Sequence, residues 1–212
     1  VGYVELKPKE FPCALRPIDG QTNIGVGGYG SVCRMQFGED CVAVKQFHSP
    51  TEYGPWINDI GDAVQEINAL RYFQKTSGII KMFITFLKYS EHVQEIKEIQ
   101  MCMPVYKCDL HTWIKNQQTE LHGKFIFNSL QHFSSIVVQL AKGLHHIHRA
   151  GFMHRDIKTL NILIEENEET VVWSDFGAAM FLFNGSAHEQ RTRDGATYWW
   201  RAPELLIQEG KK

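Results

Sequence analysis

The most informative stretch of this sequence is HRDIKTLN, residues 154–161, which is followed by DFG at residues 175–177. The first stretch places a carboxylate, an ammonium and an amide on one short loop, at Asp156, Lys158 and Asn161. The DFG motif supplies a second carboxylate. Phosphoryl transfer needs such a set, because one carboxylate orients a hydroxyl, a cation neutralises the moving phosphate, and carboxylate and amide oxygens hold Mg²⁺. We therefore expect a phosphotransfer site at these residues.

A glycine-rich segment lies upstream, GVGGYGSV at residues 25–32. Its glycines allow backbone N–H groups to approach phosphates closely. A dinucleotide-binding fold would use similar glycines, but there the loop opens a helix and an acidic residue follows about 20 positions later. Here the loop opens a β-branched, strand-like run, and Lys45 follows in VAVK, residues 42–45. This pairing argues against the dinucleotide-binding alternative and favours a different kind of phosphate-binding loop.

Glu66 is an acidic residue of the predicted helix that follows Lys45. It lies 21 residues after Lys45 on a predicted helix, residues 60–74, with Glu52 and Asp62 as alternative acids. The apolar residues that predict this helix are Ile60, Val64, Ile67 and Leu70.

Other elements follow from the same periodicity. Strands are expected at residues 41–47, 81–89 and 96–103. A long, buried helix is expected over residues 129–150. Its apolar positions are Leu130, Phe133, Ile136, Val137, Leu140 and Leu144.

Taken together, these motifs resemble the catalytic domain of eukaryotic-type serine/threonine protein kinases. The order is completed by APE at residues 202–204, and the preceding TYWWR, residues 197–201, is similar to the activation segment of cyclin-dependent and MAP kinases. MPVY at residues 103–106 and DFGAA at residues 175–179 also resemble herpesvirus-type viral kinases.

The resemblance implies an α+β, bilobal protein-kinase-like fold. Its N-lobe would be a β-sheet with one helix, and its C-lobe would be mainly helical and truncated after the activation segment. We expect an N-terminal extension at 1–21, the N-lobe at 22–104 and the incomplete C-lobe at 105–212. The lack of an initiator Met also suggests a fragment or a processed product.

The same resemblance implies the cofactors ATP and Mg²⁺ and assigns residue roles. Asp156 would orient the substrate hydroxyl and Lys158 would contact the γ-phosphate. Lys45 would hold the α- and β-phosphates with Glu66 as its partner. The implied Mg²⁺ ligands are Asn161 and Asp175. The residues implied to bind ATP are Gly25, Val26, Gly27, Gly28, Tyr29, Gly30, Val32, Ala43, Lys45, Met103, Val105 and Leu163.

The resemblance also bears on regulation and specificity. Thr192 precedes Thr197 by five residues, the interval at which cyclin-dependent kinases carry an activating phosphothreonine, and Arg155 would pair with that phosphate. Thr197 stands where serine/threonine kinases carry a Thr. Leu160 stands where many kinases that prefer basic substrates have a Glu, so the resemblance implies no such preference.

Composition narrows the expected partners and compartment. The 22 basic and 24 acidic residues give a net charge of −2, which argues against a bulk nucleic-acid binder. No apolar run approaches the roughly 20 residues of a membrane span. The five cysteines form no CxxC pair, which favours reduced thiols in the cytoplasm or nucleus, of a host cell if the protein is viral. The expected partners are a protein substrate and a regulatory protein.

Two other function classes stay open. The chain could be a nucleotide-binding pseudokinase that acts as a scaffold, or a truncated kinase fragment that binds partners. His145, His146 and His148 also suggest a zinc cluster, although no Cys or carboxylate stands nearby at ligand spacing.

Overall fold

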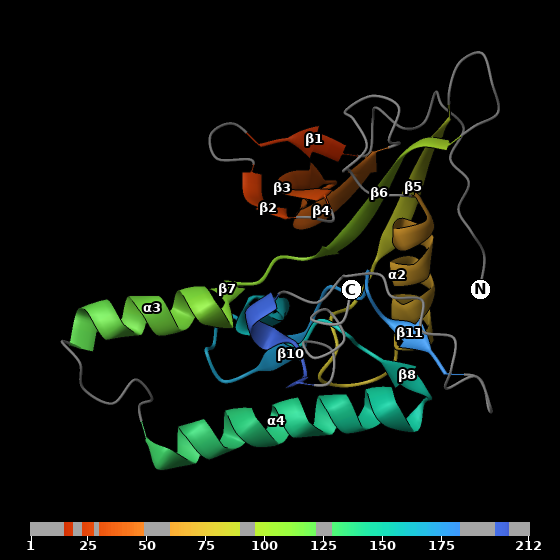
Figure 1. Ribbon diagram of the computed structural model, residues 1–212. Helices are drawn as coiled ribbons and strands as arrows, with labels where there is room; N and C mark the ends of the chain where they lie inside the picture. The colour runs from red at the N-terminus through yellow and green to blue at the C-terminus, as the bar shows by residue number, and fades with distance from the viewer. Residues whose placement is uncertain are drawn as a thin grey trace. The chain divides into compact units, whose positions relative to one another are not determined.

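The computed structural model describes residues 15–18, 23–27, 30–48, 60–89, 96–121, 129–182 and 198–203. The chain divides into two compact units, each with its own secondary structure (Figure 1). The first unit comprises residues 1–75 and 80–105, and the second comprises residues 76–79 and 106–212.

The first unit is built on an antiparallel six-stranded sheet with the order β1-β3-β4-β6-β5, in which β2 pairs with β3. Its strands are β1 (Leu15–Pro17), β2 (Asn23–Gly27), β3 (Gly30–Phe37), β4 (Asp40–His48), β5 (Ile84–Tyr89) and β6 (Ile96–Pro104). Strand β1 lies within the segment expected to be an extension, and it joins the sheet by pairing with β3. The glycine-rich segment is also more regular than expected, because its first three residues belong to β2.

One helix, α2 (Ile60–Tyr72), packs against β4 and β6. Its buried face carries Ala63, Glu66, Ile67 and Leu70. Val64, one of the apolar residues whose spacing predicted this helix, is 44% exposed and lies outside the buried face.

The strand predicted at 81–89 begins only at Ile84, because the preceding residues tie down the end of α2. The side-chain amide of Gln74 donates to the Met82 carbonyl at 2.7 Å, and Lys81 Nζ donates to the Phe73 carbonyl at 3.3 Å. These contacts anchor the helix that carries Glu66.

The sheet has an apolar core of Val42, Val44, Phe86 and Cys102. Burial raises the pKa of the Cys102 thiol to about 12, so the group stays protonated and packs as a small apolar side chain.

The second unit contains the helices α3 (Leu110–Leu121) and α4 (Leu130–Arg149) and two small sheets (Figure 1). The three-stranded sheet has the order β10-β9-β7, and β8 pairs with β11. The strands are β7 (Cys108–Asp109), β8 (Phe152–Met153), β9 (Ile162–Ile164), β10 (Val171–Trp173) and β11 (Met180–Phe181). Two short 3₁₀ turns are η1 (Thr159–Asn161) and η2 (Tyr198–Trp200).

Helix α4 begins after Ser129, whose hydroxyl accepts a hydrogen bond from the His132 N–H. Its contact with β10 is close, since a Cβ on Gly143 would lie 2.6 Å from Trp173 Cδ1. The residues that α4 buries are Ile136, Gly143 and Ile147. The prediction of a buried helix was wrong for part of its apolar surface. Its exposed residues include Leu130, Phe133 and Val137, because the helix meets β8 and β10 through one side only among the described residues.

Candidate functional site

The sheet register of the first unit gathers predicted nucleotide-binding residues on one face. Val32 on β3 pairs with Gly25 on β2 and with Lys45 on β4, and Ala43 pairs with Met103 on β6. Directly paired residues point to the same side of a sheet, and so do residues two apart on one strand. Gly25, Val32 and Lys45 therefore lie side by side across three strands. Ala43 is two residues from Lys45 on β4, so Ala43 and its partner Met103 lie on the same face of the sheet.

The other predicted ATP-binding residues are distributed along the chain. Val26 and Gly27 complete β2, and Gly27 pairs with Gly30. Val105 follows β6, and Leu163 lies on β9 in the second unit. Gly28 and Tyr29 lie outside the described residues.

Lys45 forms a buried ion pair with Glu66 of α2. The Lys45 Nζ and Glu66 Oε2 atoms are 2.7 Å apart, and the two side chains are 9% and 2% exposed. The ammonium also lies 5.1 Å from the centre of the Phe47 ring. Of the three acids considered from the sequence, the structure pairs Glu66 with Lys45, whereas Glu52 lies outside the described residues.

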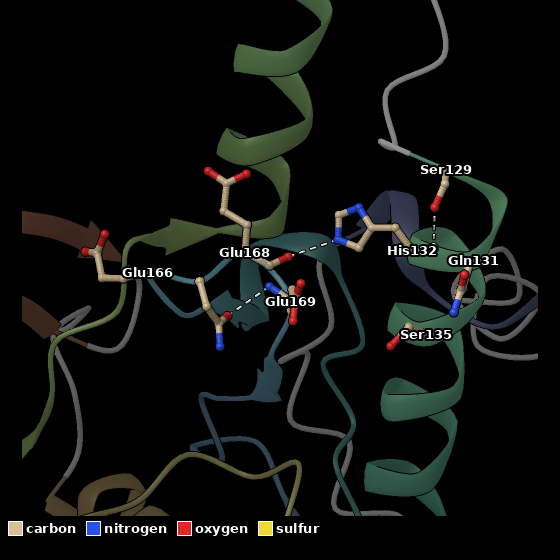
Figure 2. A pocket seen from close by; sticks show the side chains of 8 residues that line it. Ser129, Gln131, His132, Ser135, Glu166, Glu168 and Glu169 are labelled. Atoms are coloured by element: carbon tan, nitrogen blue, oxygen red, sulfur yellow. Dashed lines mark hydrogen bonds between the residues drawn. The ribbon is translucent and has the colours of Figure 1, made fainter.

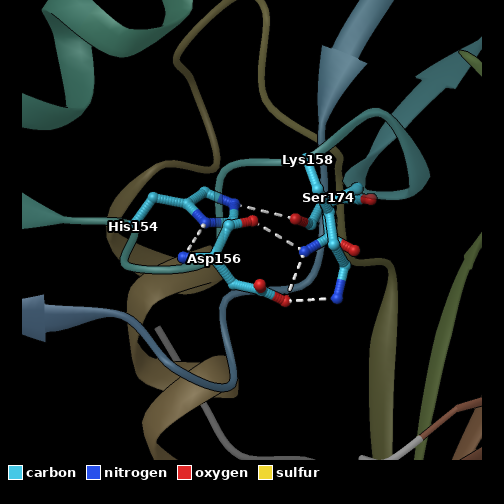
Figure 3. Close-up of polar contacts among 5 residues, drawn as sticks. His154, Asp156, Lys158 and Ser174 are labelled. Atoms are coloured by element: carbon cyan, nitrogen blue, oxygen red, sulfur yellow. Dashed lines mark hydrogen bonds and ion pairs between the residues drawn. The ribbon is translucent and has the colours of Figure 1, made fainter. Parts of the chain in front are cut away.

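In the second unit, the loop that ends at η1 brings three predicted catalytic and metal-binding residues together (Figure 3). The Asp156 Oδ2 atom accepts from Lys158 Nζ at 2.6 Å and from Asn161 Nδ2 at 2.8 Å. The same Asn161 amide group donates to the Asp156 main-chain carbonyl at 2.8 Å. Asp156 is buried, and an ammonium and an amide hold its carboxylate in place.

His154 anchors this loop to the segment before DFG (Figure 3). Its Nε2 lies 2.9 Å from the Ser174 carbonyl oxygen, and the Asp156 backbone N–H donates to its Nδ1 at 3.4 Å. A proton on Nε2 and none on Nδ1 satisfies both contacts, so the ring is neutral. Burial is the main cause that lowers the pKa of His154 below its usual value, and the Ser174 hydrogen bond and nearby Asp175 and Asp156 oppose it.

This neutral histidine predicts that the free energy of unfolding falls as the pH is lowered below about 6.5. In the unfolded state His154 has the ordinary pKa of a histidine, whereas in the folded state it takes up a proton only at lower pH. Protonation therefore favours the unfolded state. One such group contributes at most about 1.4 kcal/mol per pH unit. Urea unfolding of the wild type and of His154→Gln, from pH 7.5 to 5.5, measures the effect. Gln retains an N–H donor for Ser174 but does not titrate, so its pH dependence should be weaker.

The matched control is His148→Gln, which makes the same change at an exposed position of α4. Equal pH dependence for the wild type and His154→Gln would contradict the assignment of a neutral, buried His154.

Two residues next to these contacts have left-handed backbone conformations. Arg155 has a φ of 67° and Asp175 a φ of 60°, which cost energy for residues other than glycine. The Arg155 guanidinium lies 3.9 Å from the Met180 sulphur. The Phe176 ring is buried 4.8 Å from the His154 ring. The loop and the DFG segment therefore pack together around His154. This packing holds Arg155 and Asp175 in their left-handed conformations.

The donor groups of this unit fit a magnesium ion. The Asn161 amide nitrogen is used by Asp156, which leaves its Oδ1 oxygen as the group that a metal ion can take. Asp175 supplies a half-buried carboxylate on the neighbouring segment. Within the described ranges, no three His, Cys, Asp or Glu side chains are grouped as a metal site, and this includes His145, His146 and His148 of α4. Mg²⁺ needs no such cage, because it is usually held by one or two protein groups together with substrate phosphates and water.

A separate cavity of about 520 Å³ in the second unit was not anticipated from the sequence (Figure 2). It lies between the start of α4 and the turn that joins β9 to β10. These two walls are in contact at one point, where the His132 Nε2 atom lies 3.0 Å from the Glu168 carbonyl oxygen. Its lining is polar and acidic, and it contains none of the predicted site residues. The lining residues are Ser129, Gln131, His132, Ser135, Glu166, Asn167, Glu168 and Glu169.

The structure describes only one of the three residues predicted to have regulatory roles. Arg155 is described, whereas Thr192 and Thr197 lie outside the described residues. No helix in the described part of the chain has the length and apolar character of a membrane span.

Comparison with known proteins gives the family. The protein kinase domain matches residues 19–212. Mitogen-activated protein kinase 2 of Arabidopsis thaliana is 30% identical over 186 residues, which cover 87% of this chain and 45% of that protein. Mitogen-activated protein kinase 10 of Oryza sativa subsp. japonica is 32% identical over 87% of this chain and 28% of its own length.

The sporulation protein kinase mde3 of Schizosaccharomyces pombe is 30% identical over 88% of this chain and 33% of its own length. The chain therefore spans less than half the length of these curated relatives. The sheet-and-helix unit with its Lys45–Glu66 pair agrees with the kinase fold expected from the motifs. This chain belongs to the protein kinase domain family.

Proposed function

We propose that this protein is a serine/threonine protein kinase that transfers the γ-phosphate of ATP to a protein hydroxyl in the presence of Mg²⁺. The observation that carries the proposal is the arrangement of Asp156, whose buried carboxylate lies 2.6 Å from Lys158 Nζ and 2.8 Å from Asn161 Nδ2. A base-like carboxylate, a phosphate-binding cation and a metal-binding amide are the groups that phosphoryl transfer requires.

Each residue has a chemical task in this proposal. Asp156 accepts a hydrogen bond from the substrate hydroxyl and orients it for attack, and Lys158 compensates the charge of the transferred phosphate. Lys45 binds the nucleotide phosphates and Glu66 holds its ammonium in position. Asn161 and Asp175 would hold Mg²⁺, which supplies neutralisation of phosphate charge when it is bound. The sheet face with Gly25, Val32, Ala43 and Met103 would bind the rest of ATP.

Further parts of the proposal rest on the motifs. We propose an N-terminal extension at 1–21, an N-lobe at 22–104 and a C-lobe from 105 onward. A phosphate on Thr192 would pair with Arg155 and order the activation segment. Thr197 would contribute to the preference for Ser and Thr over Tyr. The cytoplasm or nucleus would be the place of action, with a protein substrate and a regulatory protein as partners.

The direct test is transfer of labelled γ-phosphate from ATP to a mixture of Ser-, Thr- and Tyr-containing peptides, with and without Mg²⁺. The proposal predicts metal-dependent label on Ser or Thr. Binding of Mg²⁺–ATP without transfer would instead support the pseudokinase scaffold. Label confined to Tyr would refute the serine/threonine assignment.

Asp175→Asn should lower phosphotransfer by about a hundredfold, because a neutral amide holds Mg²⁺ less well than a carboxylate. The loss should be partly recovered when the Mg²⁺ concentration is raised, since the remaining ligands still bind the ion weakly. Rates measured across a Mg²⁺ titration, with Asn167→Asp on the exposed β9–β10 turn as a charge-changing control, test this. An unchanged rate in folded Asp175→Asn would remove Asp175 from the mechanism.

A further inference from the structure

The ammonium of Lys45 has an aromatic neighbour as well as an acidic one. Its Nζ atom lies 5.1 Å from the centre of the Phe47 ring and 2.7 Å from the Glu66 Oε2 atom. Lys45 and Phe47 are two residues apart on β4, so their side chains leave the same face of the sheet. The Lys45 side chain is 9% exposed and Phe47 is 1% exposed. The ammonium therefore meets the ring almost out of contact with water.

An aromatic ring offers a buried cation more than apolar bulk. The face of the ring carries negative charge density, which attracts an ammonium that lies over it within about 6 Å of its centre. This attraction grows when water is excluded from the pair. If Phe47 were only a packing residue, its contribution would depend on its size and not on the charge distribution of its ring.

The ring and the carboxylate hold the ammonium in different ways. Glu66 belongs to α2, so its position depends on how that helix packs against β4 and β6. Phe47 belongs to the same strand as Lys45, and its register is set by the pairing with buried Ile99 on β6. A lysine side chain is a flexible four-carbon stem that carries a point charge. A ring that is fixed on the strand itself narrows the range of positions that this charge can take.

We propose that Phe47 is a positioning residue whose ring holds the Lys45 ammonium in the place from which it binds the nucleotide phosphates. This inference rests on the proposed kinase function and deepens it, because it adds an uncharged residue that acts on the phosphates only through Lys45. The effect of Phe47 on phosphotransfer should therefore follow the charge distribution of its ring rather than its volume.

The first test needs no nucleotide and measures the stability of the full chain with fluorinated phenylalanine at position 47. Fluorine draws charge from the ring face and changes the size of the ring little. One, two and three fluorines should raise the equilibrium constant for urea unfolding in steps of about twofold, up to about tenfold in all, which is the range of a buried cation–π contact. The same replacements in the Lys45→Met/Glu66→Leu background should have little effect, because the cation is absent and the cycle isolates its interaction with the ring.

Phe86 on β5 provides the matched control in the same sheet. It is also 1% exposed, and it packs with Val44 in the apolar core of the sheet. Val44 is the neighbour of Lys45 on β4, so this core lies on the opposite face from the ammonium. Fluorines on Phe86 should leave the unfolding constant nearly unchanged, because the neighbours of the ring in that core are apolar.

The second test measures phosphotransfer at saturating peptide and Mg²⁺. The fluorine series at position 47 should lower kcat/KM for ATP in steps, to about a tenth of the wild-type value with three fluorines. Phe47→Leu keeps a large apolar side chain and should lower kcat/KM by a similar factor. Folded Phe86→Leu, the matched control, should stay close to the wild type.

The outcomes separate the role of Phe47 from the function on which it rests. A response to fluorine at Phe47 no larger than that at Phe86 would overturn the proposal and leave the kinase function standing, because packing then explains the burial of the ring. Steps in unfolding with an unchanged kcat/KM would also overturn it, since the contact would then serve the fold alone. A wild type that transfers no phosphate, although the steps in unfolding are present, would overturn the kinase function and the positioning role that rests on it.

Discussion

Asp156→Asn is expected to lower the rate of phosphotransfer by about a thousandfold while the chain stays folded, since a positioned general base contributes about 10²- to 10⁴-fold. The substitution preserves the size of the side chain. Its amide oxygen can still accept from Lys158 and Asn161, which now lie 2.6 and 2.8 Å from the carboxylate. What disappears is the negative charge that orients a hydroxyl and accepts its proton.

The rate should be measured at saturating Mg²⁺–ATP and peptide, together with nucleotide binding and thermal unfolding. We expect nucleotide binding to change little, because the lost charge acts on the hydroxyl. Asp40→Asn, at the exposed first residue of β4, is the matched control and should retain full activity. A folded Asp156→Asn protein with near wild-type turnover would mean that another group orients the substrate.

Within each unit, the sequence predicted which functional residues matter better than it predicted the structure around them. The Lys45–Glu66 pair could be predicted because the motifs resemble those of protein kinases, in which an acid on a helix at about this interval holds the phosphate-binding lysine; the periods of the strand and the helix alone do not determine the contact. The same helix showed the limit. Val64 has the spacing of an apolar helix position but is exposed. Which side of the helix is buried depends on the sheet against which the helix packs, and the spacing alone does not give this.

In the catalytic loop, the residue types were predictable and the contacts were not. Nothing in the order of residues 154–161 shows that His154 donates to the Ser174 carbonyl or that Lys158 folds back onto Asp156. These contacts depend on left-handed backbone at Arg155 and Asp175, which is uncommon for residues other than glycine and which the sequence does not indicate. The polar cavity beside α4 gave no signal, because its two walls are separated by some thirty residues and consist of ordinary charged and polar side chains.

Lys45→Met is expected to abolish measurable phosphotransfer, a loss of at least about a thousandfold, because the cation that binds the nucleotide phosphates is removed. It should also destabilise the fold. Glu66 is 2% exposed and would keep a buried carboxylate without its ammonium, and breaking a buried pair in this way costs about 3–5 kcal/mol. Inactivity of this variant alone would therefore not separate a catalytic role from unfolding.

The double variant Lys45→Met/Glu66→Leu separates the two effects. It removes both charges, so the free energy of unfolding should return to within about 1 kcal/mol of the wild type, since a buried ion pair can be replaced by apolar residues at little cost. Activity should stay lost, because no cation remains to bind phosphate. Lys107→Met is the matched control, since it breaks an ion pair between Glu168 and a solvent-exposed lysine and should change stability little. Recovered stability with recovered phosphotransfer in the double variant would show that Lys45 serves only the fold. Recovered stability without phosphotransfer places Lys45 in the chemistry and Glu66 in its support.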